Sequence, residues 1–262
     1  MRIRRNNDGF SLTEVLLSVG ILTVGLIFVA GVFPVGIHFA TIASERTLGA
    51  VVADEAFAKI RLYGLDFNSP RWPADPTTEC VDFNDVSNVP LNFNEFAYPS
   101  TAADISEKKF YWSALCRRDT PSTSLVQVTV FVYRKVRAGK SYWERDLITN
   151  QPLQTALVPK PIKAAVQWNG PNPNELLILD SVTGDLVDEK TFINDGSTMV
   201  DDQTGRRFRV LERYTAPADD TILLDGNWPP AFAGDRLVWV VPPPAGGGRN
   251  PCIAIYQKEI QF

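Results

Sequence analysis

The chain of 262 residues contains a single histidine, His38, and no glycine-rich phosphate loop follows any of its predicted strands. Ser-His-Asp triads and Cys-His pairs use a histidine as general base, so any such site would have to be built on His38. That residue lies shortly after a long apolar run, which is a poor place for a base that must face a substrate cleft. These absences argue against an enzyme and leave His38 as a polar residue at the end of the apolar run.

Cysteines are also few, and Cys80, Cys116 and Cys252 are widely spaced without any C-x-x-C pair. Zinc sites usually bring such pairs together, so a zinc site is not predicted. In an exported domain two of the three cysteines could form one disulfide, but the spacing does not identify the pair. The net charge of −4 gives no reason to expect nucleic acid as the main partner.

The most prominent feature is the run FSLTEVLLSVGILTVGLIFVAGVF from Phe10 to Phe33, which contains one charge, Glu14. A helix needs ~20 apolar residues to cross a bilayer, so residues 12–33 are predicted to be transmembrane. A charged carboxylate deep in the hydrocarbon layer costs ~2.5 kcal/mol or more, and Glu14 therefore requires either a partner or a place at the membrane interface.

A short basic segment precedes the run, with three arginines opposed only by Asp8: Arg2, Arg4 and Arg5. Basic flanks stay on the cytoplasmic side, so the remainder of the chain is expected to be exported. A secretory signal peptide has a shorter apolar core followed by a small-residue cleavage site. Here the sequence that looks processed, Gly9-Phe10-Ser11-Leu12-Thr13-Glu14, stands before the apolar run instead.

This segment resembles the N-terminal signature of the type IV pilin and pseudopilin family. The resemblance implies that a prepilin peptidase removes residues 1–9 by cutting after Gly9, and that Phe10 becomes the methylated N-terminal residue. It further implies that Glu14 pairs with the N-terminal amine of a neighbouring subunit and sets the register of a filament. Small residues would then let the membrane helices pack closely: Gly20, Gly25, Ala30 and Gly31.

Beyond the apolar run, the helix is expected to bend at Pro34 and to continue to Tyr63-Gly64, giving one long helix over residues 10–64. An apolar stripe supports the second half of this helix, although Glu45 and Lys59 fall on or near it. Its members recur at helical spacing: Leu48, Val52, Ala56, Ile60 and Tyr63. This stripe predicts that the second half of the helix packs on a globular domain.

Residues 65–107 are rich in Asn, Asp, Pro, Ser and Thr and are predicted to be a variable, mostly irregular region, whereas 108–262 form a β-rich head. A hairpin is predicted from two alternating segments, Phe110–Leu115 and Val126–Tyr133. Six more strands are expected between turn signals: Ile162–Trp168, Glu175–Asp180, Arg206–Tyr214, Thr221–Leu224, Arg236–Val241 and Cys252–Phe262.

The pattern predicts an α+β fold in which the long helix packs on an antiparallel, pilin-like sheet. The head is longer than a typical pilin head, so we expect a split near residue 190 and an extra β subdomain from about Thr191.

Two groups of charged residues in the head are candidate sites. Acidic turns at Asp201-Asp202, Asp219-Asp220 and Asp225 could supply oxygen ligands to calcium, but their spacing matches no EF-hand loop, so no cofactor is predicted. A basic patch comprises Arg206, Arg207, Arg209 and Arg213, the last three on one face of a strand. It would suit an anionic surface or DNA, or would be the charged face of an edge strand.

The leading hypothesis is a structural subunit, favoured to be a minor one, of a type IV pilus or a type II secretion pseudopilus. It would span the inner membrane once, with its N-terminus cytoplasmic and its head periplasmic, before entering the filament. The implied partners are other pilin subunits, the prepilin peptidase and an inner-membrane assembly platform. The alternative is a single-pass anchored protein whose exported β-rich domain binds a ligand or another protein.

Overall fold

The computed structural model describes residues 11–75, 77–102, 104, 107–119, 124–135, 141–145, 152–156, 158–168, 170–180, 187–214, 220–229, 234–248 and 250–262. The chain divides into two units, which are described separately. The first comprises Met1–Thr47 and the second comprises Leu48–Phe262. The described residues form one long apolar helix and antiparallel sheets, so the α+β class predicted from the sequence is confirmed.

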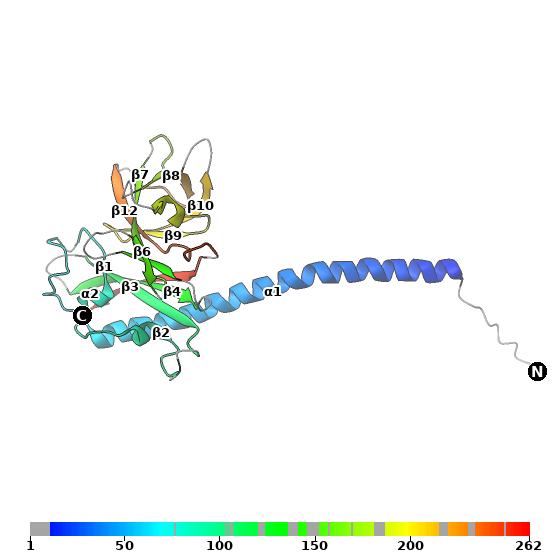
Figure 1. The fold of residues 1–262 in the computed structure, drawn as a ribbon, viewed down its shortest axis with the longest axis horizontal. Coiled ribbons are helices and arrows are strands. Elements are labelled where there is room, and N and C mark those ends of the chain that lie inside the picture. Colours follow the sequence, from blue (N-terminus) through cyan, green and yellow to red (C-terminus); the bar gives the residue numbers. More distant parts are fainter. Residues whose placement is uncertain are drawn as a thin grey trace, which may run out of the picture. The chain divides into compact units, whose positions relative to one another are not determined.

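The helix α1 extends from Leu12 to Tyr63 and continues through Pro34, as expected (Figure 1). It ends where predicted because Gly64 has a φ of +70°, a conformation that glycine adopts at little cost. The Gly64 N–H still donates to the Ile60 carbonyl at 3.0 Å, which satisfies one of the last carbonyls of the helix.

Within the second unit, α1 buries one face, and Val52, Ala56 and Ile60 of the predicted stripe are all in the core. Leu48 was also predicted to be buried but is exposed, because Gly49, Ala53 and Phe57 turn the buried face slightly around the helix. Gly49 lies beside β13, where an added Cβ would be 3.7 Å from the Tyr256 hydroxyl and 3.8 Å from the Ala254 Cβ. The contact with the sheet is therefore made by small residues and by Val52, Phe57 and Ile60.

This face of α1 packs on a five-stranded antiparallel sheet in the order β1-β3-β4-β13, with β2 also paired to β3. Its strands are β1 (Val81–Asp82), β2 (Ala97–Tyr98), β3 (Phe110–Arg118), β4 (Leu125–Arg134) and β13 (Cys252–Gln261). The predicted hairpin is present as β3 and β4, which place Trp112 opposite Val132. Among its described residues, the region between α1 and β3 also contains two short elements, α2 (Phe83–Val86) and the 3-10 helix η1 (Phe93–Phe96).

A closed barrel follows, with strand order β10-β11-β8-β7-β12-β9 (Figure 1). Its strands are β7 (Ile162–Trp168), β8 (Glu175–Leu179), β9 (Thr198–Asp201), β10 (Arg207–Tyr214), β11 (Thr221–Leu224) and β12 (Asp235–Val240). Alternate residues of each strand point inward and fill the barrel with apolar side chains, so it holds a packed core. Trp228 and Phe192 are among its largest fully buried side chains.

The extra β subdomain predicted from about Thr191 therefore begins earlier, at Ile162, and the last strand β13 returns to the first sheet. Besides the short strands β1 and β2, three strands were not predicted. One is β9, and the others are β5 (Tyr142–Arg145) and β6 (Pro152–Ala156), which form a two-stranded sheet. A second 3-10 helix, η2 (Glu189–Phe192), lies between β8 and β9.

The barrel covers the second face of the five-stranded sheet. Leu115 and Phe131 of the sheet share a buried cluster with Val200 of β9 and with Val241, just after β12. Covering on both faces explains why most residues of β3 and β4 are buried. It also explains why β4 carries Val on one face and Phe131 and Tyr133 on the other.

The barrel closes where β12 pairs with β9, and a buried ion pair reinforces this contact. The guanidinium Nη2 of Arg236 lies 3.0 and 2.9 Å from the two carboxylate oxygens of Asp201. The Asp201 side chain is 0% exposed and that of Arg236 is 10% exposed. Such a pair is costly to break because one partner alone is left as a buried charge.

We predict that Asp201→Ala lowers the free energy of unfolding by about 3 kcal/mol or more, since it strands Arg236. Urea unfolding followed by tryptophan fluorescence measures this change, because all six tryptophans lie in the second unit. Asp54→Ala is the matched control, because the pair of Asp54 with Lys258 has side chains that are 72% and 49% exposed. The control should cost less than about 1 kcal/mol. Equal losses in both variants would contradict the special role of the buried pair.

Candidate functional surfaces

The first candidate surface is the part of α1 that belongs to the first unit. Its apolar side chains are exposed from Leu12 to Phe39. Of the described helices, this one alone is long and apolar enough to cross a membrane. At the usual rise per residue, residues 12–33 span about 33 Å, which matches a hydrocarbon layer of about 30 Å. Gly20, Gly25 and Gly31 have open space where a side chain would be, so their backbone is accessible to another helix.

Glu14 lies in the first turn of α1, where a negative charge is favourable to the helix dipole. Its side chain is exposed, and its carboxylate has no partner among the described residues. Gly9 and Phe10, the predicted cleavage and methylation positions, lie outside the described residues. The single histidine, His38, is exposed on the same helix, with its ring centroid 6.2 Å from that of Phe39.

The three cysteines are free thiols in the structure, and Cys80 and Cys116 are buried. Burial raises the pKa of all three thiols, that of Cys252 to about 12. A thiol must ionise to act as a nucleophile or metal ligand, so these residues behave as core side chains. Val81 pairs with Cys116, which places Cys80 next to that pair, yet the two thiols belong to different buried clusters.

The acidic turns proposed as calcium ligands are not brought together. Asp201 is held by Arg236 and by the N–H and hydroxyl of Thr204, at 2.8 and 2.6 Å. Asp220 forms ion pairs with Arg213 at 2.7 Å and with Lys190 at 2.8 Å, and these bonds lower its pKa. Asp225 accepts the Arg209 N–H, while Asp219 lies outside the described residues. Within the described ranges, no group of three His, Cys, Asp or Glu side chains is placed to hold a metal ion.

Asp202 has a different role, because its buried carboxylate binds three donors from separate segments. It accepts the Cys80 N–H at 3.1 Å and the Trp239 indole N–H at 2.5 Å, and it pairs with Lys163 at 2.9 Å. Burial raises the pKa of Asp202, while the bonds from Lys163, Trp239 and Cys80 offset part of that effect. The carboxylate thus joins the barrel to the loop that precedes β1.

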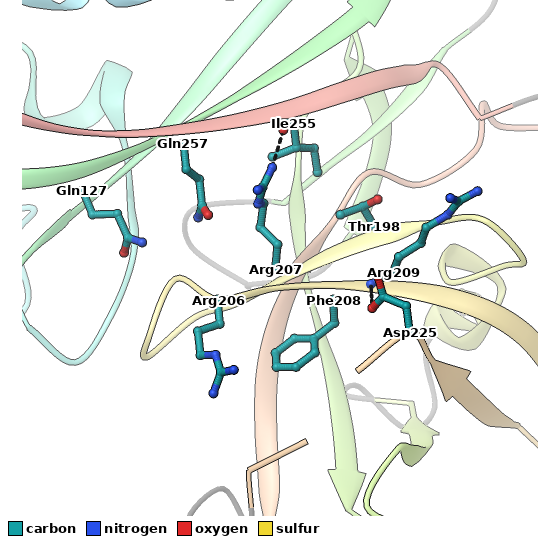
Figure 2. A pocket seen from close by; sticks show the side chains of 9 residues that line it. All are labelled: Gln127, Thr198, Arg206, Arg207, Phe208, Arg209, Asp225, Ile255 and Gln257. Carbon is teal, nitrogen blue, oxygen red and sulfur yellow. Dashed lines mark hydrogen bonds between the residues drawn. The ribbon is translucent and has the colours of Figure 1, made fainter. Parts of the chain in front are cut away.

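The basic patch is partly assembled. Arg206, Arg207 and Arg209 line one cleft of about 460 Å³, which Figure 2 shows between β10 and β13. Arg213 does not line it, because its guanidinium bonds to Asp220 and to the carbonyls of Lys190 and Ile193. The edge-strand interpretation is wrong, because β10 pairs with β9 on one side and with β11 on the other.

A smaller cavity of about 210 Å³ lies at the edge of β3, and sequence reasoning missed it. Asp82, Tyr111, Trp112 and Lys160 are among its lining residues. The carboxylate of Asp82 caps α2 by accepting the Asn84 N–H at 2.9 Å. Burial is the main reason that the pKa of Asp82 rises to about 6, with a smaller contribution from Asp85. Only the cap could have been read from the sequence, since the burial depends on residues distant along the chain.

Comparison with family models, with curated proteins and with solved structures found no match for this chain.

The raised pKa of Asp82 predicts a pH-dependent stability. Because folding raises this pKa from 3.8 to about 6, the folded chain binds the proton more tightly than the unfolded chain does. The contribution of Asp82 to the free energy of unfolding is therefore most favourable below about pH 4, and it is lost as the pH rises through about 6. Two pKa units correspond to about 3 kcal/mol, and the partial exposure of the side chain reduces the expected effect to about 1–2 kcal/mol.

We expect Asp82→Asn, which keeps a side-chain oxygen for the cap, to be more stable than the natural chain at pH 8 by that amount and equal to it at pH 3.5. Urea unfolding at both pH values measures the difference. Asp85→Asn removes a neighbouring charge from an exposed position and should give a smaller gain at pH 8. If Asp82→Asn gave the same change at both pH values, ionisation of Asp82 would not be the cause.

Proposed function

We propose that the chain is a structural subunit, favoured to be a minor one, of a type IV pilus or a type II secretion pseudopilus. The observation that carries the proposal is that the two parts of α1 differ in burial. The first part of α1 is apolar and exposed, and it follows Gly9-Phe10 in the sequence. Glu14 is its one acidic residue before Glu45. The last four turns of α1 are packed on an antiparallel sheet.

Physical considerations support an assembly role for this helix. In a bilayer, lipid covers the exposed apolar side chains, and in a filament the helices of other subunits would cover them instead. Without a hydrophobic drive between helices in lipid, close packing at small residues such as Gly20, Gly25 and Gly31 provides the contact energy. Glu14 then distinguishes one axial position from the others, because its charge is satisfied only beside a cation.

The cation would come from processing. Cleavage after Gly9 creates an α-amine at Phe10, which is mostly protonated near neutral pH because its ordinary pKa is about 8. A carboxylate left unpaired in the hydrocarbon layer costs ~2.5 kcal/mol or more, so a subunit gains by docking where its Glu14 meets the amine of a neighbour. In this proposal the chain sits in the inner membrane with its head in the periplasm, and it enters the filament through the assembly platform.

The alternative is a single-pass anchored protein whose exported domain binds a ligand or partner. The closed barrel and its arginine-lined cleft favour this alternative, because neither is needed to build a filament. The two proposals differ in what happens at the N-terminus, which makes them separable.

We predict that the mature chain begins at Phe10 and carries one N-methyl group. Top-down mass spectrometry of the chain purified from its own membranes measures both features, and deletion of the prepilin peptidase should leave residues 1–9 in place. A chain that retains Met1 in cells containing the peptidase, or one cut after the apolar run, would refute the pilin proposal. Such a result would favour the anchored binding protein.

We further predict that Glu14→Ala leaves membrane insertion unchanged and reduces incorporation into filaments by at least about tenfold, since a lost charge pair in lipid exceeds 1.4 kcal/mol. The measurement is the ratio of chain in sheared filaments to chain in membranes. Ser18→Ala is the matched control one turn later, because the Ser18 hydroxyl is satisfied within its own helix by the Val15 carbonyl at 2.8 Å. Normal incorporation of Glu14→Ala would falsify the register role.

A further inference from the structure

The cleft between β10 and β13 has no role in the assembly proposed above, and its geometry is that of a binding site. Figure 2 shows Arg207 and Arg209 extending from β10 toward the side of β13, while Arg206 extends the other way. The alternation of β10 explains this, because Arg207 and Arg209 are exposed on the outer wall of the barrel and Phe208 between them points into its core. Residues two apart on one strand face are separated by about 7 Å.

The two arginines differ in how they are held. One guanidinium N–H of Arg207 donates to the Ile255 carbonyl at 2.6 Å, which fixes the side chain and leaves its other donors open. Arg209 uses its backbone N–H to bind Asp225 at 2.9 Å, but its guanidinium has no partner among the described residues. The cleft therefore presents one fixed and one available guanidinium, carried by residues two apart on one face of β10.

Neutral polar groups complete the wall. Thr198 lies opposite Arg209 on β9, and Gln257 comes from β13 on the other side. The Gln257 amide nitrogen donates to the Thr129 hydroxyl and to the Gly205 carbonyl, so its carbonyl oxygen remains as an acceptor. Side chains that both donate and accept are suited to the amide groups of a peptide backbone.

Three observations decide which anion fits. Guanidinium groups bind carboxylates and phosphates equally well in geometry, so the surroundings must discriminate. Single-stranded nucleic acid normally stacks its bases on exposed aromatic rings, yet the one ring of this cleft, Phe208, is 4% exposed and has the Arg206 guanidinium 5.7 Å from its centroid. The carboxylate of Asp225 also lines the cleft, and the chain carries a net charge of −4, which disfavours the closely spaced phosphates of a nucleic acid more than two separate carboxylates.

We propose that this cleft binds an extended acidic peptide segment of a partner protein, with carboxylates two residues apart that pair with Arg207 and Arg209. In an extended peptide, side chains at i and i+2 lie on one face with Cα atoms about 7 Å apart, which is the same backbone repeat that separates Arg207 and Arg209 on β10. The peptide amides between them face Thr198 and Gln257. This binding activity is independent of filament assembly and goes beyond it.

The test uses the full chain in a neutral detergent and fluorescence anisotropy of a labelled peptide, Thr-Glu-Thr-Glu-Thr. We expect saturable binding that weakens as sodium chloride rises from about 50 to 300 mM, because salt screens charge pairs. Arg209→Gln should weaken binding by about tenfold or more, the value of one charge-assisted hydrogen-bonded pair. Arg209→Lys should restore it only in part, because lysine lacks the bidentate fork.

Two controls make the result specific. Arg71→Gln removes the same charge from an exposed position of the second unit and should leave the affinity unchanged. The peptide Thr-Glu-Glu-Thr-Thr has the same charge with adjacent carboxylates on opposite faces, and it should bind at least about fivefold more weakly.

Equal binding of the two peptides, or an Arg209→Gln variant that binds as the natural chain does, would overturn the proposal. So would an absence of peptide binding. Tighter binding of a twelve-residue oligothymidine that is lost in Arg209→Gln would replace the acidic peptide by nucleic acid. None of these outcomes bears on cleavage at Gly9 or on filament incorporation, so failure here is distinguishable from failure of the assembly role.

Discussion

The buried carboxylate of Asp202 is the contact on which the organisation of the second unit depends. Its two oxygens bind a backbone N–H from the loop before β1, an indole N–H from β12 and the ammonium of Lys163 from β7. Removing a carboxylate from water is costly unless its lone pairs are filled, so the barrel and the loop are stable in the arrangement that supplies all three donors. Lys163 is adapted to the same contact, since its pairs with Asp202 and Glu79 outweigh the effect of burial and raise its pKa.

This polar contact lies beside an apolar one, and the two have different consequences. Val200, Val241, Leu115 and Phe131 bury hydrophobic surface between sheet and barrel, which provides binding energy without much directional preference. The hydrogen bonds at Asp202 fix the orientation of the barrel against the sheet, together with the bond from Arg117 to the Gln203 carbonyl at 2.6 Å. The cleft lined by Arg207 and Arg209 is open at the margin of this interface, where the apolar contact ends.

Much of the secondary structure follows from the sequence, because its signals are local. The end of α1 at Tyr63 could be predicted from Gly64, and the strands β7 and β11 have the bounds that were predicted for them. Barrel closure could not be predicted, since it depends on β9, whose four residues are too few to show a period. The residues of β9 pair with β10 on one side and with β12 on the other. The local sequence of β9 does not indicate which strands it pairs with.

The charged residues show the same limit more sharply. Asp201 and Asp202 were interpreted as exposed turn residues with a remote chance of holding calcium, whereas both are buried in pairs with cations 35 and 39 positions away. Arg213 was grouped with the other arginines by its place on the strand, but its guanidinium binds Asp220, which also pairs with Lys190. A sequence reveals which residues carry charge, and only the fold determines which of them neutralise each other.

The return of β13 to the first sheet has a consequence for the order of folding. Gln257 bonds to Thr129, 128 positions earlier, so β4 lacks its second neighbour until the whole barrel has been synthesised. Contacts of such long range form slowly, and an unpaired strand edge invites pairing with other chains in the meantime.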